Sequence, residues 1–526
     1  MSLPLRTTAE VRIALIERRE IALLDVREED PHAQAHPLFA ANLPLGRIEI
    51  EAYAKLPRRD LPIVVMDDDE GDAQIAVRRL QSLGYTDVSL LAGGLSGWRE
   101  AGGELFRDVN VPSKAFGELV EAERHTPSLA AEEVQALIDR GEDVVIVDAR
   151  RFDEYHTMSI PTATSVPGAE LVLRVPQLAP RPETRVVVNC AGRTRSIIGT
   201  QSLINAGLAN PVAALRNGTI GWTLAGQKLD HGQQRRFGPT PEEDREEAAR
   251  KARAVADRAG VHRATLTSVV PWQSQQGRTT YFFDVRTPEE YETGHLPGFR
   301  SVPGGQLAQE TEMVAPVRGA RIVLADDDGV RANMTASWLA QMAWEVHVLD
   351  DLTVADFAEL GPWRPPLPAT PLVSRVDAAT LAGWLVAGGT AVLDFTTSAN
   401  YLKGHIPGAW FVLRSQLSEA LKQIPAARRY VLTCATSALA RFVAAELQAL
   451  VTADVSVLDG GTQAWRAAGL EVESGPTRIG SPPIDRYRRP YEGTDNAHAA
   501  MQAYLDWEYG LVRQLARDGT HHFRVI

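Results

Sequence analysis

The sequence predicts an α/β protein in which one structural unit is repeated four times, and regular spacing is the main evidence. Four apolar segments end in an aspartate, at Asp25, Asp148, Asp284 and Asp394. A second apolar segment then runs into a polar loop, which begins at Asp67, Cys190, Asp326 or Cys434. The first three loops lie 42 residues after their aspartate, and the fourth lies 40 residues after it. Spacing this constant is the signature of an internal repeat.

Within each unit, short apolar runs alternate with segments that have helical spacing. Residues 62–65 and 321–324 are continuous apolar runs, whereas residues 75–80 and 442–447 place apolar side chains at helical intervals without a breaker. Buried strands that alternate with helices are typical of a parallel sheet covered on both faces. We therefore predict, for each unit, a mainly parallel sheet with helices on both faces and functional loops at the carboxyl ends of the strands.

Linkers divide the chain into six parts. A proline-rich stretch at 362–368 and an acidic helix start at 239–250 mark two boundaries, and the second is expected to separate a first pair of domains from a second pair. The predicted parts are domains at 1–110, 122–232, 263–361 and 370–475, a helical linker at 233–262, and a C-terminal tail at 476–526. In the tail we expect one helix over 496–515 and assign it no chemistry.

Composition limits the function classes. The chain has 526 residues, a net charge of −12 and an ordinary apolar content of 44%, which argues against nucleic-acid and anionic-membrane partners. No apolar run reaches the roughly 20 residues of a membrane span, and the first residues lack a signal-peptide core. Two cysteines cannot form a disulfide framework, so we expect a reducing cytoplasm, with no metal and no cofactor.

The loop at Cys190 has the layout of an activated thiol. Three valines at 186–188 lead into Cys190, and a helical pattern begins near Ser196. Only the thiolate is a good nucleophile. The helix N-terminus, the charges of Arg193 and Arg195, and a nest of backbone N–H groups around Gly192 should together lower the thiol pKa and hold an anion.

Four motifs in this order resemble the rhodanese family of sulfurtransferases over residues 10–475. They are an Asp-x-Arg strand end, a Gly-His-Ile-Pro-Gly turn at 404–408, the Cys-x-x-x-x-Arg loop at 190–195 and a Gly-Gly-x-x-x-Trp turn at 460–465. The resemblance implies a ping-pong reaction in which Cys190 takes a sulfane sulfur from a small donor such as thiosulfate, becomes a persulfide, and passes the sulfur to cyanide or to a thiol, a protein thiol included. It also implies that the donor and the bound sulfur contact Ala191, Gly192, Arg193, Thr194, Arg195 and Ser196. Asp148 and Arg150 would orient the loop from below.

The other copies depart from this pattern. Acidic runs at 67–72 and 326–328 replace the cysteine, and carboxylates cannot carry a persulfide and repel an anionic donor, so we predict that domains 1 and 3 are inactive. Acidic triplets could bind calcium or magnesium, but consecutive aspartates on a tight loop seldom all face one ion. In domain 4, Cys434 lacks a following glycine and has Leu439 at the arginine position, which leaves a second candidate site or a buried loop cysteine.

Two alternative functions remain open. Three defective copies suggest a persulfide carrier or scaffold whose domains bind partners. A cysteine-dependent phosphatase is disfavoured because it places arginine six positions after cysteine, whereas Arg195 lies five positions after Cys190. Two-domain family members commonly join an inactive domain to an active one with the site near their interface, and the order of the four copies suggests this arrangement used twice.

Overall fold

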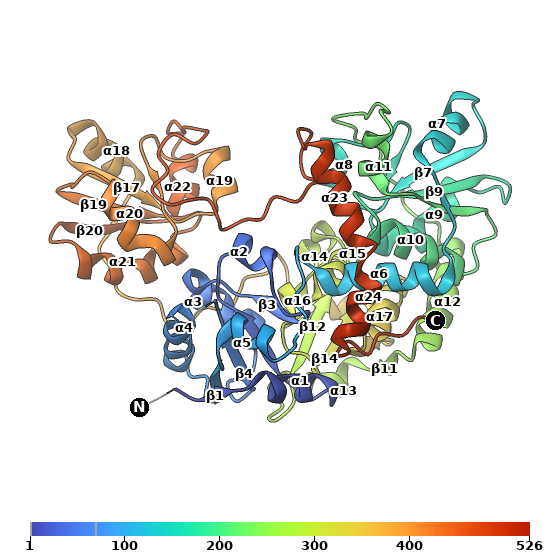
Figure 1. Ribbon diagram of the computed structural model, residues 1–526. Helices are drawn as coiled ribbons and strands as arrows, with labels where there is room; N and C mark the ends of the chain where they lie inside the picture. The colour runs from blue at the N-terminus through green and yellow to red at the C-terminus, as the bar shows by residue number, and fades with distance from the viewer. Residues whose placement is uncertain (1–2, 69–70) are drawn as a thin grey trace.

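The computed structural model describes residues 3–68 and 71–526, and it contains four sheets of five parallel strands (Figure 1). Strand order is the same in each sheet, β1-β5-β4-β2-β3 in the first and its equivalents in the others. Helices cover both faces of the sheets. The predicted α/β architecture of four tandem domains is confirmed.

The first half of the chain forms domains 1 and 2. The elements of domain 1 are β1 (Leu5–Arg6), α1 (Thr8–Ile16), β2 (Ala22–Asp25), α2 (Glu29–Gln34), β3 (Ala40–Asn42), η1 (Leu45–Arg47), α3 (Ile48–Lys55), β4 (Ile63–Met66), α4 (Gly71–Ser82), β5 (Val88–Leu91) and α5 (Gly94–Glu100). A connecting helix, α6 (Val111–Arg124), leads to domain 2. Its elements are β6 (Ser128–Leu129), α7 (Ala131–Asp139), β7 (Val144–Asp148), α8 (Phe152–Thr157), β8 (Thr164–Ser165), η2 (Gly168–Glu170), α9 (Leu171–Leu178), β9 (Arg185–Asn189), α10 (Thr194–Asn205), β10 (Val212–Leu215) and α11 (Gly218–Leu224).

The second half begins with the linker helix α12 (Glu242–Ala259). Domain 3 contains β11 (His262–Ala264), α13 (Leu266–Val269), η3 (Val270–Ser274), β12 (Thr280–Asp284), α14 (Pro288–Thr293), β13 (Arg300–Ser301), α15 (Gly304–Gln309), α16 (Thr311–Val314), β14 (Arg321–Ala325), α17 (Arg331–Gln341), β15 (Glu345–Leu349) and η4 (Val354–Asp356). Domain 4 contains β16 (Arg375–Val376), α18 (Ala378–Ala387), β17 (Thr390–Asp394), α19 (Ser398–Lys403), β18 (Trp410–Phe411), η5 (Arg414–Gln416), α20 (Leu417–Gln423), β19 (Arg429–Thr433), α21 (Ala438–Leu450), β20 (Asp454–Leu458) and α22 (Gly461–Ala467). The tail carries α23 (His498–Glu508) and α24 (Leu511–Asp518).

The domains do not associate in the expected order along the chain. The short helix after the third strand is the meeting point, and η2 of domain 2 packs on α15 of domain 3 while η1 of domain 1 packs on η5 of domain 4. Arg331 of domain 3 pairs with Glu170 of domain 2 at 3.1 Å, and Arg414 of domain 4 pairs with Glu49 of domain 1 at 2.7 Å. The linker helix α12 packs on both α9 and α17, so it folds domain 3 back onto domain 2 instead of separating two pairs.

The tail differs from its prediction as well. It forms two helices instead of one, with a break at Tyr509 and Gly510, where glycine weakens the helix. The chain leaves domain 4, crosses to domain 2 and runs down over α6, and α23 also contacts α11 (Figure 1). Among the described residues, no helix combines the length and the apolar character that a membrane span requires.

An aspartate–arginine pair closes the carboxyl end of the second strand in three domains. In domain 2, Arg150 Nε and Nη2 donate to the two carboxylate oxygens of Asp148 at 2.9 and 2.8 Å, and Asn189 Nδ2 donates to Asp148 at 2.9 Å. Both Asp148 and Arg150 are buried. Equivalent pairs join Arg27 to Asp25 and Arg286 to Asp284. Because Asn189 precedes Cys190, this pair fixes the base of the Cys190 loop.

Domain 4 has lost the arginine of this pair. Thr396 stands in its place, and the Oδ2 atom of Asp394 has no hydrogen-bond partner among the described residues. Burial raises the pKa of Asp394 to about 7. Below that pH, the folded domain holds a neutral carboxyl group at this position.

We expect Asp394→Asn to remove a pH-dependent loss of stability from domain 4. The folded-state pKa is raised from 3.8 to about 7, so the stabilising effect of the neutral carboxyl is complete below about pH 4 and is lost as the pH rises through about 7. The loss is on the order of 4 kcal/mol. The loss is measured by urea unfolding at about pH 4 and about pH 8, with hydrogen exchange of peptides from β17 and β19 as the probe of domain 4.

The matched control for this prediction is Asp284→Asn. That change should destabilise domain 3 at both pH values, because it removes the buried carboxylate that pairs with Arg286 and leaves this arginine with its polar contacts to Asp327 and the Gly294 carbonyl. An equal pH dependence in wild-type and Asp394→Asn domain 4 would contradict the prediction.

Candidate active site

Cys190 lies at the carboxyl end of β9, in a short loop that leads into α10. The helix begins at Thr194, two residues earlier than expected, so Arg195 and Ser196 belong to its first turn. The thiol donates to Ser196 Oγ at 3.3 Å, and that hydroxyl donates to the carbonyl of Arg193 at 2.8 Å. The side chain of Cys190 is buried, and its residue is 1% exposed. The loop therefore holds the sulfur at the start of the helix, as the sequence predicts.

The late turn that carries Trp222 holds this loop from the side. The Thr219 N–H donates to the carbonyl of Cys190 at 2.9 Å, and the Ile220 N–H donates to the carbonyl of Ala191 at 3.0 Å. Gly218 has a φ of +54°, and a Cβ there would lie 2.4 Å from the Cys190 oxygen. Only glycine allows this close approach. From the sequence alone, the Trp222 turn is interpreted as packing. Gly218 is the sequence feature that indicates its contact with the Cys190 loop.

The two arginines of the Cys190 loop form ion pairs with different residues. Arg193 is 3% exposed and turns away to α6, where its Nε and Nη2 donate to Glu118 at 2.7 and 2.9 Å. Its guanidinium also stacks on the ring of Tyr509, 4.1 Å from the centroid. Arg195 instead pairs with both oxygens of Glu154 at 2.7 and 2.9 Å. Burial alone would raise the pKa of Glu154, but Arg195 lowers it to about 2. Of the two cations, Arg195 is the one that borders an open cleft.

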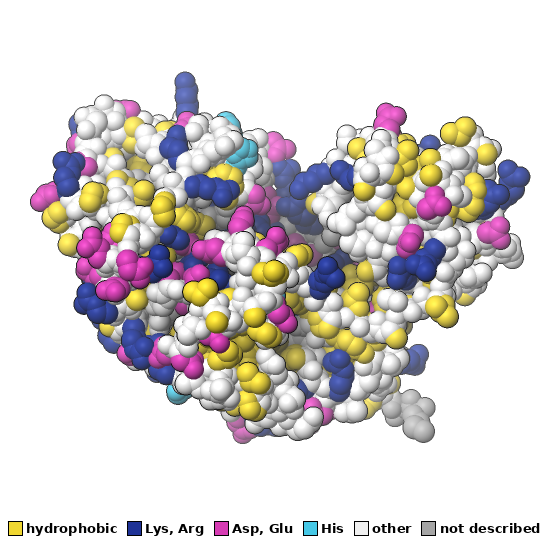
Figure 2. All heavy atoms as spheres, turned by 180° about the vertical axis from the view of Figure 1, so that it is seen from behind, with side chains coloured by type: hydrophobic (Ala, Val, Ile, Leu, Met, Phe, Trp, Pro, Cys, Tyr) yellow, Lys and Arg dark blue, Asp and Glu magenta, His cyan; other side chains and the backbone are white. Residues whose placement is uncertain are grey.

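That cleft has a volume of about 330 Å³ and lies where domains 2, 3 and 4 and the tail converge. Glu310 comes from domain 3, Lys403 from domain 4 and Tyr491 from the tail. Its cationic lining consists of Arg150, Arg151, Arg195, Lys403, Arg486 and Arg489. Figure 2 shows the molecule hollowed between domains 2 and 4, with Lys and Arg side chains on the walls. Four carboxylates, Asp153, Glu154, Glu310 and Glu492, also line the cleft, so its six cations outnumber its acidic groups and favour a small anion that approaches Arg195.

The thiol pKa departs from its prediction. Burial raises the pKa of Cys190 above its usual value, and the opposing effects of Arg195 and Ser196 do not overcome it. Tyr491, Tyr504 and Leu505 of the tail pack in one apolar cluster with Ala191, the residue next to Cys190, and so add to the burial of the loop. The helix and arginine signals are present, but desolvation of the charged form outweighs them. The aromatic side chains of the tail were the sequence signal for this cover.

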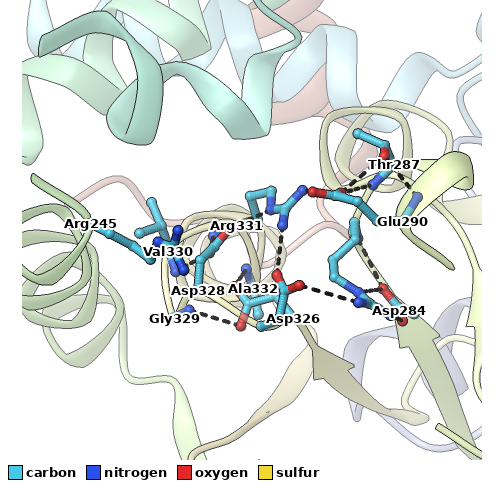
Figure 3. Close-up of polar contacts among 12 residues, drawn as sticks. Arg245, Asp284, Thr287, Glu290, Asp326, Asp328, Gly329, Val330, Arg331 and Ala332 are labelled. Atoms are coloured by element: carbon cyan, nitrogen blue, oxygen red, sulfur yellow. Dashed lines mark hydrogen bonds and ion pairs between the residues drawn. The ribbon is translucent and has the colours of Figure 1, made fainter. Parts of the chain in front are cut away.

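The loop of domain 3 is filled by its own carboxylates (Figure 3). Asp326 accepts from the N–H groups of Gly329 and Ala332 at 3.1 and 2.8 Å, and Asp328 accepts from Val330 and Arg331 at 2.7 and 3.1 Å. Arg331, the counterpart of Arg195, is 2% exposed and pairs with Asp328 at 2.7 Å. The N–H groups that would hold an anion are thus already bonded to carboxylates, and the inactivity of this domain stays a prediction.

In the described part of domain 1, an aspartate likewise accepts a hydrogen bond from a backbone N–H group at the start of the following helix. Asp67 accepts from the Ala73 N–H at 2.9 Å, while Asp69 and Glu70 of the predicted acidic run lie outside the described residues. Across 3–68 and 71–526, no group of three or more His, Cys, Asp or Glu side chains is arranged to hold a metal ion.

Cys434 keeps part of the arrangement in domain 4. It is 6% exposed, and burial raises its thiol pKa, although the N–H groups of Ala440, Thr436 and Leu439 act in the opposite direction. A cavity of about 210 Å³ between domains 1 and 4 is lined by Leu439 and by Arg47. Cys434 remains a secondary candidate.

Comparison with known proteins places these observations in a family. The family model "Rhodanese-like domain" matches residues 8–101, 130–225, 272–351 and 377–468. The chain belongs to the rhodanese-like domain family. Four rhodanese-like domains with one complete Cys-x-x-x-x-Arg loop are therefore present in one chain.

Two individual proteins are similar to this rhodanese-like chain. A crystal structure of a thiosulfate sulfurtransferase from Pseudomonas aeruginosa is 69% identical, covers 100% of both chains and superposes with a TM-score of 0.98. The thiosulfate sulfurtransferase GlpE of Coxiella burnetii (strain RSA 493 / Nine Mile phase I) is 26% identical over 85 residues, which are 16% of this chain and 78% of GlpE.

We expect Tyr504→Ala to accelerate alkylation of Cys190 in the full chain. Removing this ring opens the apolar cover over Ala191, so water reaches the loop and the thiol pKa falls toward its usual value. The expected gain is roughly tenfold in the iodoacetamide rate at neutral pH. Mass spectrometry of Cys190 and Cys434 peptides from one sample measures both rates. Cys434 serves as the internal control, and an unchanged Cys190 rate would show that the tail does not shield the thiol.

Proposed function

We propose that this protein is a cytoplasmic sulfurtransferase that moves the sulfane sulfur of thiosulfate through a Cys190 persulfide to cyanide or to a thiol, including a protein thiol. The observation that carries the proposal is the domain-2 loop, where a cysteine, a glycine and an arginine five positions after the cysteine occur together. Full-length similarity at 69% identity to a thiosulfate sulfurtransferase supports the same donor.

In the proposed reaction, atoms and electrons balance at each step. Thiosulfate enters the cationic cleft and places its charge against Arg195. The Cys190 thiolate attacks the outer sulfur, so a bond forms between the two sulfurs while the bond to the sulfite sulfur breaks. Sulfite leaves with the electron pair of that bond. The bound sulfur then lies at the N-terminus of α10, where backbone N–H groups stabilise its charge. Attack of the acceptor on the outer sulfur returns Cys190 to the thiolate.

Loop length favours sulfur over phosphate as cargo. Ser196 occupies the sixth position after Cys190, where a cysteine-dependent phosphatase has its arginine, and its hydroxyl contacts the thiol at 3.3 Å. The tighter loop suits one sulfur atom better than a tetrahedral phosphate. Hydrolysis of an aryl phosphate without sulfur uptake would favour the phosphatase instead.

A carrier or scaffold role is the second candidate. It is favoured by the domain-3 loop, in which Asp326 and Asp328 occupy the anion-binding N–H groups. Such a protein would load sulfur on Cys190 without passing it to a small acceptor, and it would co-purify with partner proteins.

Cys190→Ser is expected to abolish thiosulfate:cyanide turnover, whereas Cys434→Ser should largely spare it. Serine lacks the sulfur that forms the persulfide, and Cys434 lacks the loop arginine. Thiocyanate production gives the rate, and mass spectrometry after thiosulfate treatment locates one added sulfur by peptide. Equal turnover in wild-type and Cys190→Ser protein would overturn the assignment.

Arg195→Gln is expected to lower kcat/KM for thiosulfate by about a hundredfold, because the variant removes the cation that meets the donor next to the thiol. Arg195→Lys, which keeps the charge but not the two-pronged pairing with Glu154, should recover part of the loss. The control is Arg181→Gln, an arginine with a 69% exposed side chain outside the cleft. Steady-state kinetics at varied thiosulfate concentration separates KM from kcat, and equal losses in Arg181→Gln would rule out a specific role.

A further inference from the structure

Glu508, the last residue of α23, lies against the Cys190 loop from outside the repeated domains. It is 0% exposed. A Cβ placed on Gly192 would be 3.2 Å from Glu508 Oε2 and 3.1 Å from the ring of Tyr504. Glycine at position 192 is thus what allows the carboxyl to approach the backbone of the loop.

The two oxygens of Glu508 differ in their partners. Oε1 accepts from the Tyr504 hydroxyl at 2.9 Å, whereas Oε2 has no hydrogen-bond partner among the described residues. A buried carboxyl oxygen without a partner is costly, and it is most costly when it carries charge. The unpartnered atom is the one that faces the loop.

The charged neighbours of Glu508 are paired with other groups. Lys114 of α6 donates to Asp108 at 2.6 Å, and Arg193 of the loop pairs with Glu118 of α6. Tyr491 packs edge-on against Tyr504 at 5.3 Å between centroids. Burial raises the pKa of Glu508 to about 8, Glu118 adds to this effect, and Lys114, Tyr504 and Arg193 oppose it. Glu508 therefore holds a proton at neutral pH.

We propose that Glu508 is a positioning residue of the Cys190 site, which presents a neutral carboxyl to the loop during sulfur transfer and disfavours the anionic donor once it ionises. This inference rests on the proposed function. The Glu508 side chain acts through Gly192 and through the charge that it adds beside the thiol.

Electrostatics gives the direction of the effect. An ionised Glu508 raises the pKa of Cys190, so it opposes both the thiolate that attacks and the persulfide anion that forms. The same negative charge also repels a dianionic donor that approaches the loop. The neutral acid has neither effect, and no proton passes from it to thiosulfate, so the balance of the transfer step is unchanged.

Ionisation of Cys190 and ionisation of Glu508 have opposite effects on the rate of persulfide formation, and together they set its pH dependence. Ionisation of Cys190 makes persulfide formation faster as the pH rises, whereas ionisation of Glu508 makes it slower as the pH rises through about 8. The wild type should therefore lose rate on the alkaline side. Glu508→Gln keeps the shape and a hydrogen-bonding group but cannot ionise, so its rate should continue to rise instead.

The experiment is single-turnover persulfide formation from thiosulfate on the full chain, from about pH 6 to about pH 10. Four proteins are compared: wild type, Glu508→Gln, Tyr504→Phe and the control Glu123→Gln, which makes the same chemical change at an exposed position of α6. Tyr504→Phe removes the hydrogen bond that lowers the Glu508 pKa, so its alkaline loss should move to higher pH. Glu123→Gln should follow the wild type.

Different outcomes of this experiment would overturn the positioning role of Glu508 and the proposed sulfur transfer. A Glu508→Gln profile that overlays the wild type, or one lowered by the same factor at every pH, would overturn the positioning role. A wild type that forms no persulfide at any pH would overturn the proposed function instead. Loss of the alkaline limb in Glu508→Gln, with its shift in Tyr504→Phe, is the result expected.

Discussion

Each loop in this protein joins a buried strand to the first turn of a helix, and the N–H groups of that turn have no partners within the helix. These N–H groups need a hydrogen-bond acceptor, and the residue that supplies it differs among the four domains. Asp326 and Asp328 supply carboxylates in domain 3, and Asp67 does so in domain 1. In domains 2 and 4 the position belongs to sulfur, at Cys190 and Cys434. One backbone requirement thus underlies both the Cys190 loop and the loops filled by side chains of the chain itself.

The domains without a cysteine still shape the site. Domain 3 supplies Gln309 and Glu310 to the cleft, and Arg331 joins it to domain 2 through Glu170. The guanidinium that corresponds to Arg195 has become an interdomain ion pair. With an aspartate at the cysteine position, domain 3 uses this arginine to bond to fixed carboxylates and to hold domain 2.

The sequence predicts features that depend on residues within one repeat unit, and it does not predict features that depend on residues far away in the chain. The parallel sheets and the place of Cys190 at the carboxyl end of a strand depend on neighbours within one unit, so the repeat revealed them. The thiol pKa and the direction of Arg193 depend on Tyr504, Tyr509 and Glu118, which are far away in the sequence. Local signals at Gly192 and Arg195 could not show that a distant helix removes water from the loop. The predicted role of the 233–262 linker was wrong for the same reason, because α12 packs on α9 of domain 2 and on α17 of domain 3, contacts that its local sequence does not indicate.

The tail helices that pack on the Cys190 loop are synthesised after the four domains. Residues 498–518 follow all four domains in the chain, so they leave the ribosome after those domains, which fold as units during synthesis. Until α23 docks, the Ala191 side of the domain-2 loop lacks the apolar contacts of Tyr504 and Leu505. The surroundings of Cys190 are therefore completed only after the domain that carries it has been synthesised.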